Sequence, residues 1–150
     1  RRPSSPTGGR RSAVHQTVSD VDWDLLRTAA MAVAERAYAP YSGLRVGAAA
    51  LTASGRVVRG CNVENSSYPV GTCAEAGLVA GLHAAGYDHP VAVATWSPDA
   101  PERPLMPCGA CRQILFEAGG AELRVAHHDG HRRLAELLPE AFGPGDLPGS

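Results

Sequence analysis

Two short stretches decide how this chain folds: CAE at residues 73–75 and, after 31 intervening residues, PCGAC at residues 107–111. Each opens a run of helix-forming residues that glycine ends, so we predict helices over 73–85 and 108–118. The first residues of a helix expose unpaired N–H groups and the positive end of the helix dipole, which stabilise thiolates. Because the thiolate is the form of cysteine that binds metal, the sequence predicts a metal site at these helix starts.

The ligand set of that site is incomplete for a purely structural metal. Cys73, Cys108 and Cys111 supply three of the four ligands of a tetrahedral Zn²⁺, and an open fourth position filled by water is typical of catalysis. Glu75 lies two residues after Cys73, at the mouth of the same helix. Zn²⁺ can lower the pKa of bound water to about 7, and a nearby carboxylate can relay its proton. We therefore expect Glu75 to be the catalytic acid and base.

Outward from these stretches, the rest of the chain alternates helices and strands. Trp23, Leu26, Ala30, Val33 and Ala37 recur at helical spacing, which predicts an amphipathic helix that Ser19 or Asp20 caps and Pro40 stops. Residues 45–52 and 56–63 predict a hairpin, 91–96 and 122–127 predict strands, and 133–138 predicts a short helix. This order predicts a mixed sheet with helices on both faces, its last two strands parallel to a neighbour.

Length and charge limit the classes of protein to consider. The 150 residues make one domain, the net charge is −1, and no apolar run is long enough to span a bilayer. Four cysteines without a secretory signal favour metal or catalytic use over disulfides. Residues 1–19, rich in Arg, Pro, Gly and Ser, predict a disordered extension before a folded domain at 20–150. We expect a cytoplasmic protein that binds neither a polynucleotide nor a membrane.

Further motifs accompany the two cysteine stretches along the chain. The full set is YAPYS at 38–42, VGAA at 46–49, GCNVENSSY at 60–68, CAE at 73–75, PCGACRQ at 107–113 and LLPEAFGP at 137–144. With this ordered set, the chain resembles the small, homotetrameric cytidine deaminases of the three-cysteine zinc type. The resemblance covers residues 20–147. A Cys₃ zinc site with a non-ligand Glu and a P-C-x-x-C element is the pattern of zinc-dependent nucleobase deaminases.

The resemblance implies a fold, a cofactor and a reaction. The fold would be a three-layer α/β/α arrangement around a mixed five-stranded sheet. Cys73, Cys108 and Cys111 would hold one Zn²⁺ per subunit. Zinc-bound hydroxide would attack C4 of cytidine or deoxycytidine, with Glu75 as proton shuttle, to give uridine or deoxyuridine in pyrimidine salvage.

It also implies how the nucleoside binds. Asn62 and Glu64 match the pair that hydrogen-bonds the ribose hydroxyls, while Leu44 and Ala74 would contact the base. Tyr68 and Phe142 occupy positions that reach a neighbouring subunit's site. The resemblance therefore implies a homotetramer with shared active sites and a small nucleoside as ligand.

Two positions depart from the family. Leu44 stands where an aromatic residue is usual, so the base loses a π-face and roughly 1 kcal/mol of contact. Ala76 stands where many three-cysteine members have an Arg that offsets the charge of the thiolates. Our hypothesis is that Arg112 or the helix-terminal N–H groups compensate for it.

Other interpretations stay open. A modified cytosine nucleoside, such as a blasticidin-type antibiotic, is an alternative substrate that the two departures allow. One alternative of another class is a non-catalytic zinc-stapled interaction module, against which Glu75 argues. Another is a thiol redox protein, against which Cys73 argues. Asn62 and Glu64 could be turn residues, and Leu44, Tyr68 and Phe142 could pack within their own subunit. Cys61 fits a packed strand end, and a solvated loop is expected to carry His127, His128 and His131.

Overall fold

The computed structural model describes residues 21–149, so the predicted extension over 1–19 lies outside the described residues and the domain boundary stays a prediction. The elements in chain order are α1 (Trp23–Ala34), β1 (Gly47–Thr52), β2 (Val57–Cys61), η1 (Tyr68–Val70), α2 (Ala74–Ala84), β3 (Pro90–Trp96), α3 (Gly109–Gly119), β4 (Arg124–His127), β5 (Gly130–Arg133), α4 (Leu134–Leu137) and η2 (Pro144–Asp146). In this part of the chain, no helix has the length and hydropathy needed to cross a membrane.

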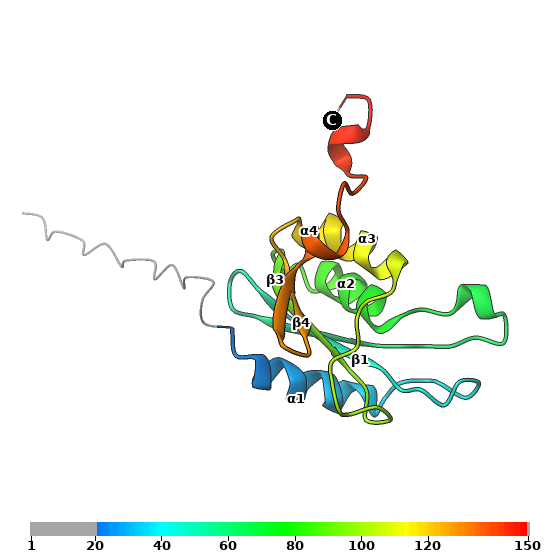
Figure 1. Cartoon of the computed structure of the whole chain (residues 1–150). Helices are drawn as coiled ribbons and strands as arrows, with labels where there is room; N and C mark the ends of the chain where they lie inside the picture. The colour runs from blue at the N-terminus through cyan, green and yellow to red at the C-terminus, as the bar shows by residue number, and fades with distance from the viewer. Residues whose placement is uncertain (1–20, 150) are drawn as a thin grey trace, which may run out of the picture.

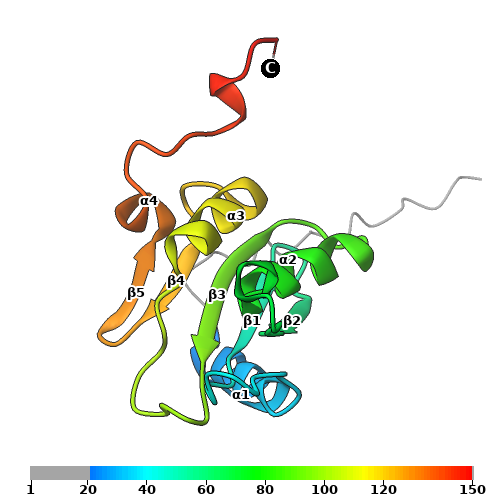
Figure 2. The same cartoon turned by 90° about the vertical axis from the view of Figure 1, so that its right-hand side faces the viewer.

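One mixed sheet forms the middle of the molecule, with the strand order β2-β1-β3-β4-β5 (Figures 1 and 2). The hairpin partners β1 and β2 are antiparallel, and β1 is also antiparallel to β3. β3 and β4, which α3 connects, are parallel. The predicted mixed sheet and its parallel pair are confirmed.

Helices cover both faces of this sheet, as Figure 1 shows. α1 packs over one face through a cluster that includes Leu26, Ala49 and Ala94. On the other face, α2 and α3 pack over a cluster that includes Ala48, Leu78 and Leu115. β1 is buried on both faces and carries only small residues in its first half, because helices approach it from both sides. This three-layer α/β/α arrangement is the predicted fold class.

The first helix differs in detail from its prediction. α1 begins after Asp22, whose carboxylate accepts a hydrogen bond from the Leu25 N–H at 2.9 Å, and it ends at Ala34. Its buried stripe includes Ala29 and Ala34, whereas Val33 is only half-buried. The expected end near Ala37 was therefore wrong by one turn, and the expected caps before residue 21 lie outside the described residues.

A fifth strand replaces part of the predicted loop after β4. His128 and Asp129 form the turn of a tight hairpin, and the positive φ of 133° at Gly130, the first residue of β5, suits a residue without a side chain. The chain returns as β5, antiparallel to β4. His131 belongs to this strand and stacks on Trp23 with 5.6 Å between ring centroids. A wholly solvated loop was thus the wrong prediction for this segment.

Candidate metal centre and its cleft

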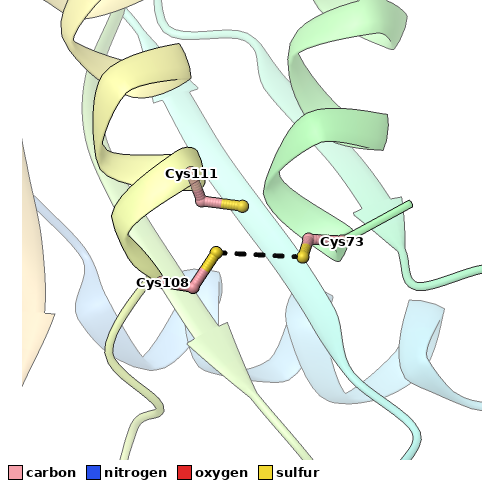
Figure 3. Close-up of side chains that lie close together, drawn as sticks. All are labelled: Cys73, Cys108 and Cys111. Atoms are coloured by element: carbon pink, nitrogen blue, oxygen red, sulfur yellow. Dashed lines mark hydrogen bonds between the residues drawn. The ribbon is translucent and has the colours of Figure 1, made fainter. Parts of the chain in front are cut away.

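The starts of α2 and α3 bring three cysteines together. Cys73 is the residue before α2, Cys108 is the residue before α3, and Cys111 lies in the first turn of α3. Figure 3 shows the three side chains pointing toward one another from the two helices. The backbones of Cys73 and Cys108 are extended, so each thiol lies at the open end of its helix.

The spacing of the three sulfurs suits a zinc ion. The Sγ atoms of Cys73 and Cys108 are 4.0 Å apart, and all three sulfurs lie within 4.8 Å of one another. Zinc–sulfur bonds of about 2.3 Å in a tetrahedron place sulfurs about 3.8 Å apart. Thiolate is also the ligand that zinc favours in such sites. These residues therefore fit Zn²⁺ after a small contraction.

The thiols affect one another's protonation. Burial raises the pKa of Cys73 and of Cys111, and the nearby charge of Glu75 raises the pKa of Cys111 further. A backbone hydrogen bond from Cys111 lowers the pKa of Cys108. Two of the three thiols thus resist ionisation in the protein alone, and a cation bound among them would favour their thiolate form.

A cleft of about 190 Å³ opens beside the cysteines, and Glu75 lies in its wall. Glu75 belongs to the first turn of α2 and is only 4% exposed. The Thr95 hydroxyl on β3 donates a hydrogen bond to Oε1 of Glu75 at 3.2 Å. The residues that line the cleft are Val46, Asn62, Cys73, Ala74, Glu75, Thr95, Leu105, Met106 and Cys108.

Asn62 reaches this cleft but uses much of its amide elsewhere. Its Oδ1 accepts a hydrogen bond from the Val46 N–H at 2.7 Å, and its Nδ2 donates to the Leu44 carbonyl at 2.9 Å. The side chain therefore holds the segment that enters β1. One N–H and one lone pair of the amide remain for another partner.

Glu64 and Tyr68 lie in a neighbouring cavity of about 320 Å³, which also includes Tyr41 and Ser42. The Glu64 carboxylate accepts hydrogen bonds from the Tyr41 N–H at 2.9 Å and from the Ser42 hydroxyl. The Ser42 hydrogen bond is the largest cause that lowers the pKa of Glu64. Leu44, at 39% exposed, lines neither cavity. The structure therefore separates these predicted site residues from the cysteines.

Phe142 belongs to the C-terminal segment and is 59% exposed. Figures 1 and 2 show this segment leaving the body of the molecule beyond α4. The side-chain amide of Gln113 donates to the Phe142 carbonyl at 2.8 Å. The start of the segment is thus attached to α3, one of the two helices that carry the cysteines.

Arg112, the residue after Cys111, contacts carbonyl groups rather than sulfur. Its Nε donates to the Pro107 carbonyl at 2.9 Å, and its Nη1 donates to the Leu137 carbonyl at 2.8 Å. The guanidinium therefore fixes the peptide just before Cys108 and joins it to the end of α4. Ala76 is half-buried and offers no charge at its position.

A second group of donor atoms lies at the β4–β5 hairpin, where His127, His128 and Asp129 approach within 4.8 Å. Here the Asp129 carboxylate already pairs with Arg132 at 2.9 Å and with His127 at 2.5 Å. The hydrogen bond from Arg132 is the largest cause that lowers the pKa of Asp129. We therefore interpret this cluster as an ion-pair network that stabilises the hairpin.

Sequence reasoning missed several residues of the cleft. Thr95 was read only as part of a buried strand, although a hydroxyl in a run of apolar strand residues signals a hydrogen-bond partner. Leu105 and Met106 come from the proline-rich loop after β3, and no periodicity marks a loop residue as part of a wall. Ser42 could be placed beside Glu64 only once the fold was known.

Three thiols beside a buried carboxylate, in a three-layer α/β/α fold, define the class of zinc-binding deaminases. The chain belongs to the cytidine and deoxycytidylate deaminase family, whose zinc-binding region matches residues 22–127. It is 53% identical over 129 residues to a cytidine deaminase of Mycobacterium tuberculosis, covering 86% of this chain and 96% of that protein.

Solved structures show the same likeness. A substituted form of the cytidine deaminase from Mycobacterium tuberculosis has a TM-score of 0.82 at 51% identity, covering 85% of this chain and 100% of that one. Cytidine deaminase from Mycobacterium leprae has a TM-score of 0.77 at 44% identity, covering 81% of this chain and 100% of that one. The five-stranded α/β fold is therefore that of cytidine deaminases.

Proposed function

We propose that this chain hydrolytically deaminates cytidine and deoxycytidine to uridine and deoxyuridine, in pyrimidine salvage in the cytoplasm. The reaction replaces the amino group on C4 of the ring with an oxygen from water and releases ammonia. The observation that carries the proposal is the cleft itself, in which a buried carboxylate faces the same small space as the cysteines. A structural zinc site needs neither the cleft nor the carboxylate.

Cys73, Cys108 and Cys111 would hold one Zn²⁺ per chain. When bound, zinc supplies Lewis-acid activation of a water molecule near neutral pH. Glu75 would carry a proton to N3 of the ring and a later proton to the departing amine. Its burial at 4% exposure keeps bulk water away from that transfer.

The nucleoside would bind along the cleft and the neighbouring cavity. Asn62 retains one N–H and one lone pair for a ribose hydroxyl, and Glu64 would accept from the same sugar. Ala74, buried at 1% exposure in the cleft wall, would contact the base. Leu44, which lines neither cavity here, would have to move toward the ring to offer an apolar contact in place of aromatic stacking.

A homotetramer with shared active sites would account for two exposed aromatic residues. Tyr68 is 74% exposed and Phe142 is 59% exposed, each on a segment that projects from the sheet layers. Tyr68 also contacts Tyr41, with 5.7 Å between ring centroids, and an exposed patch of this kind favours a protein partner. Both residues would then complete the site of a neighbouring subunit.

An ultraviolet assay of zinc-quantified protein with cytidine and deoxycytidine tests the activity. We expect loss of the cytidine absorbance, and we expect Glu75→Gln to lower kcat by at least about a hundredfold while zinc stays near one per chain. Zinc-loaded wild-type protein that turned over no cytosine nucleoside would contradict the proposal.

A blasticidin-type nucleoside belongs in the same assay as the second candidate substrate. Leu44 favours this comparison, because it stands where an aromatic residue would be expected to stack on an ordinary cytosine ring. Turnover of the antibiotic without turnover of cytidine would assign the chain to modified cytosine nucleosides.

A further inference from the structure

Thr95 is a buried polar residue of the cleft with no part in the function proposed above. It is 4% exposed and lies near the end of β3, opposite Ala48 of β1. Its Oγ1 donates to Oε1 of Glu75, which comes from α2. The contact therefore joins the central sheet to the residue expected to move the protons.

Within residues 21–149, this hydroxyl is the sole hydrogen-bond partner of the Glu75 carboxylate. A carboxylate on a flexible side chain can rotate about its last bond, because that torsion is broad. Fixing Oε1 on the sheet sets the plane of the group and leaves Oε2 for the cleft. Proton transfer requires an approach of about 2.6–3.2 Å, so this orientation bears directly on catalysis.

The backbone of Thr95 holds a second part of the cleft. Its carbonyl accepts a hydrogen bond from the Leu105 N–H at 2.8 Å, and Leu105 lines the cleft. A β-branched side chain is also restricted about χ1, so the hydroxyl keeps a stable direction. One residue thus fixes both the carboxylate and part of the facing loop.

We propose that Thr95 is a positioning residue, whose hydroxyl orients the Glu75 carboxylate for proton transfer. The proposal rests on the deaminase function proposed above. It predicts that removing the hydroxyl slows turnover without weakening nucleoside binding. A merely structural role for Thr95 predicts lower stability at an unchanged kcat.

Thr95→Val tests the role, because valine keeps the shape of threonine and removes only the hydroxyl. The variant loses a hydrogen bond to a carboxylate, so we expect kcat for cytidine to fall by about ten- to a hundredfold. KM should change less than about twofold, and bound zinc should stay at the wild-type level. Thr95→Ser, which restores the hydroxyl, should recover most of kcat.

Thr52→Val is the matched control. Thr52 is another buried strand threonine, at 1% exposure, and its hydroxyl bonds with Ser54 and with the Arg56 N–H, both at 3.1 Å. It lines none of the cavities described above. This variant should lose stability and keep the wild-type kcat. Wild-type kcat in Thr95→Val, or an equal loss in both variants, would overturn the proposal.

A thermodynamic cycle separates this proposal from the proposed function. Thr95→Val should lower the denaturation midpoint of zinc-loaded wild-type protein more than it lowers that of the Glu75→Ala variant, because the contact is already lost there. Equal shifts in the two backgrounds would refute the contact itself, even if cytidine were not a substrate. If the coupling were present but wild-type protein did not turn over cytidine, the contact itself would stand. The proposed function would then be contradicted, and with it the assignments of Glu75 as proton shuttle and of Thr95 as its positioning residue.

Discussion

Arg112 shows how one residue can support a metal site without touching the metal. Its guanidinium bonds the carbonyls of Pro107 and Leu137, so it fixes the peptide that precedes Cys108. Groups that orient metal ligands typically change metal affinity about 10- to 100-fold when removed. We expect Arg112→Ala to weaken zinc binding by about that factor, measured by competition with a chromogenic chelator.

Arg36→Ala is the control for that variant. Arg36 is exposed on the surface just after α1, and its loss removes the same charge without a carbonyl contact. It should leave zinc affinity unchanged. If Arg112→Ala left both zinc affinity and the pH–rate profile at wild-type values, Arg112 would neither hold the loop nor compensate for Ala76.

Arg124 on β4 presents the opposite case, because part of its guanidinium is buried without a hydrogen-bond partner. Among the described residues, its Nε and Nη2 atoms are the buried side-chain nitrogen or oxygen atoms that lack a hydrogen bond. Burial also lowers the pKa of the guanidinium. We expect Arg124→Met to raise the free energy of unfolding by about 1–3 kcal/mol, measured by urea denaturation.

Arg133 is the matched position on β5, directly opposite Arg124. Its side chain is 54% exposed and pairs with Glu122 at 3.2 Å. Arg133→Met should therefore leave the free energy of unfolding nearly unchanged, or lower it slightly. If Arg124→Met lowered the free energy of unfolding as much as a core substitution does, the packing of the aliphatic part of Arg124 would matter more to stability than its buried charge.

The residues of the metal centre could be predicted from sequence because helix-start cysteines are local features. Cys108 and Cys111 lie on one turn, and Glu75 lies two residues after Cys73. Thr95 could not be predicted in its role, because its partner on α2 is 20 residues away and only the packing of that helix on β3 brings the two together. The separation of Glu64 from the cysteine cleft likewise depends on tertiary structure.

At the scale of elements, the contact between α2 and β2 depends on a glycine. A Cβ atom at Gly60 would lie 2.3 Å from the Leu78 backbone nitrogen and 2.4 Å from the Ala74 carbonyl oxygen. The helix that begins at the metal centre would have to move away. We expect Gly60→Ala to destabilise the fold by at least about 1–3 kcal/mol, measured by thermal unfolding.

Gly81, in the middle of α2, makes the comparison specific. A Cβ atom there would meet no atom closer than 3.7 Å. Alanine is favoured over glycine inside a helix by about 0.8–1.0 kcal/mol, so Gly81→Ala should be neutral or stabilising. Similar losses at both positions would mean that backbone flexibility, rather than the approach of α2, decides the effect.

Element types were predictable wherever turn signals bounded a periodic run, as in the β1–β2 hairpin. The end of α1 was not, because Ala37 continues the apolar spacing of Val33 beyond Ala34, where the helix ends. β5 was hidden because GHRR at residues 130–133 has no apolar residue. Its strand conformation comes from pairing with β4 at the edge of the sheet, which no local pattern reports.

At the scale of the molecule, Arg45 joins segments that are distant in sequence. It pairs with Asp99 after β3 at 2.8 Å and with Glu35 after α1 at 2.7 Å. The Arg45 hydrogen bond is the largest cause that lowers the pKa of Asp99 in the folded protein. The folded pKa is thus below the unfolded value of about 3.9, so the pair stabilises the fold above that pH and less as pH falls.

Asp99→Asn tests this pH dependence. The variant should melt below the wild type between about pH 5 and 7, and the gap should narrow as pH falls below about 4. Melting curves across that range measure it. A gap that stayed constant down to about pH 2 would mean that ionisation of Asp99 is not the cause.

Metal removal should affect the whole fold. Zinc at the three cysteines would connect α2 to α3, and a metal that binds only the native state stabilises it by mass action. We expect a strong chelator to lower the melting temperature by at least several degrees and added Zn²⁺ to restore it. Cys111→Ser should melt at one temperature with or without chelator.

The sheet has one short pairing, here called the seam, between β3 and β4. β3 and β4 pair over only two residues, Ala92 with Arg124 and Val93 with Val125, whereas β1 and β3 pair over six. The part of the chain after the seam, including α3, is held to the rest by the buried cluster that Ala48, Leu78 and Leu115 share. The metal centre spans this seam, because Cys73 lies before it and Cys108 after it. Zinc bound there would hold the two sides together, so we expect amide protons of β4 and β5 to exchange with solvent faster once the metal is removed.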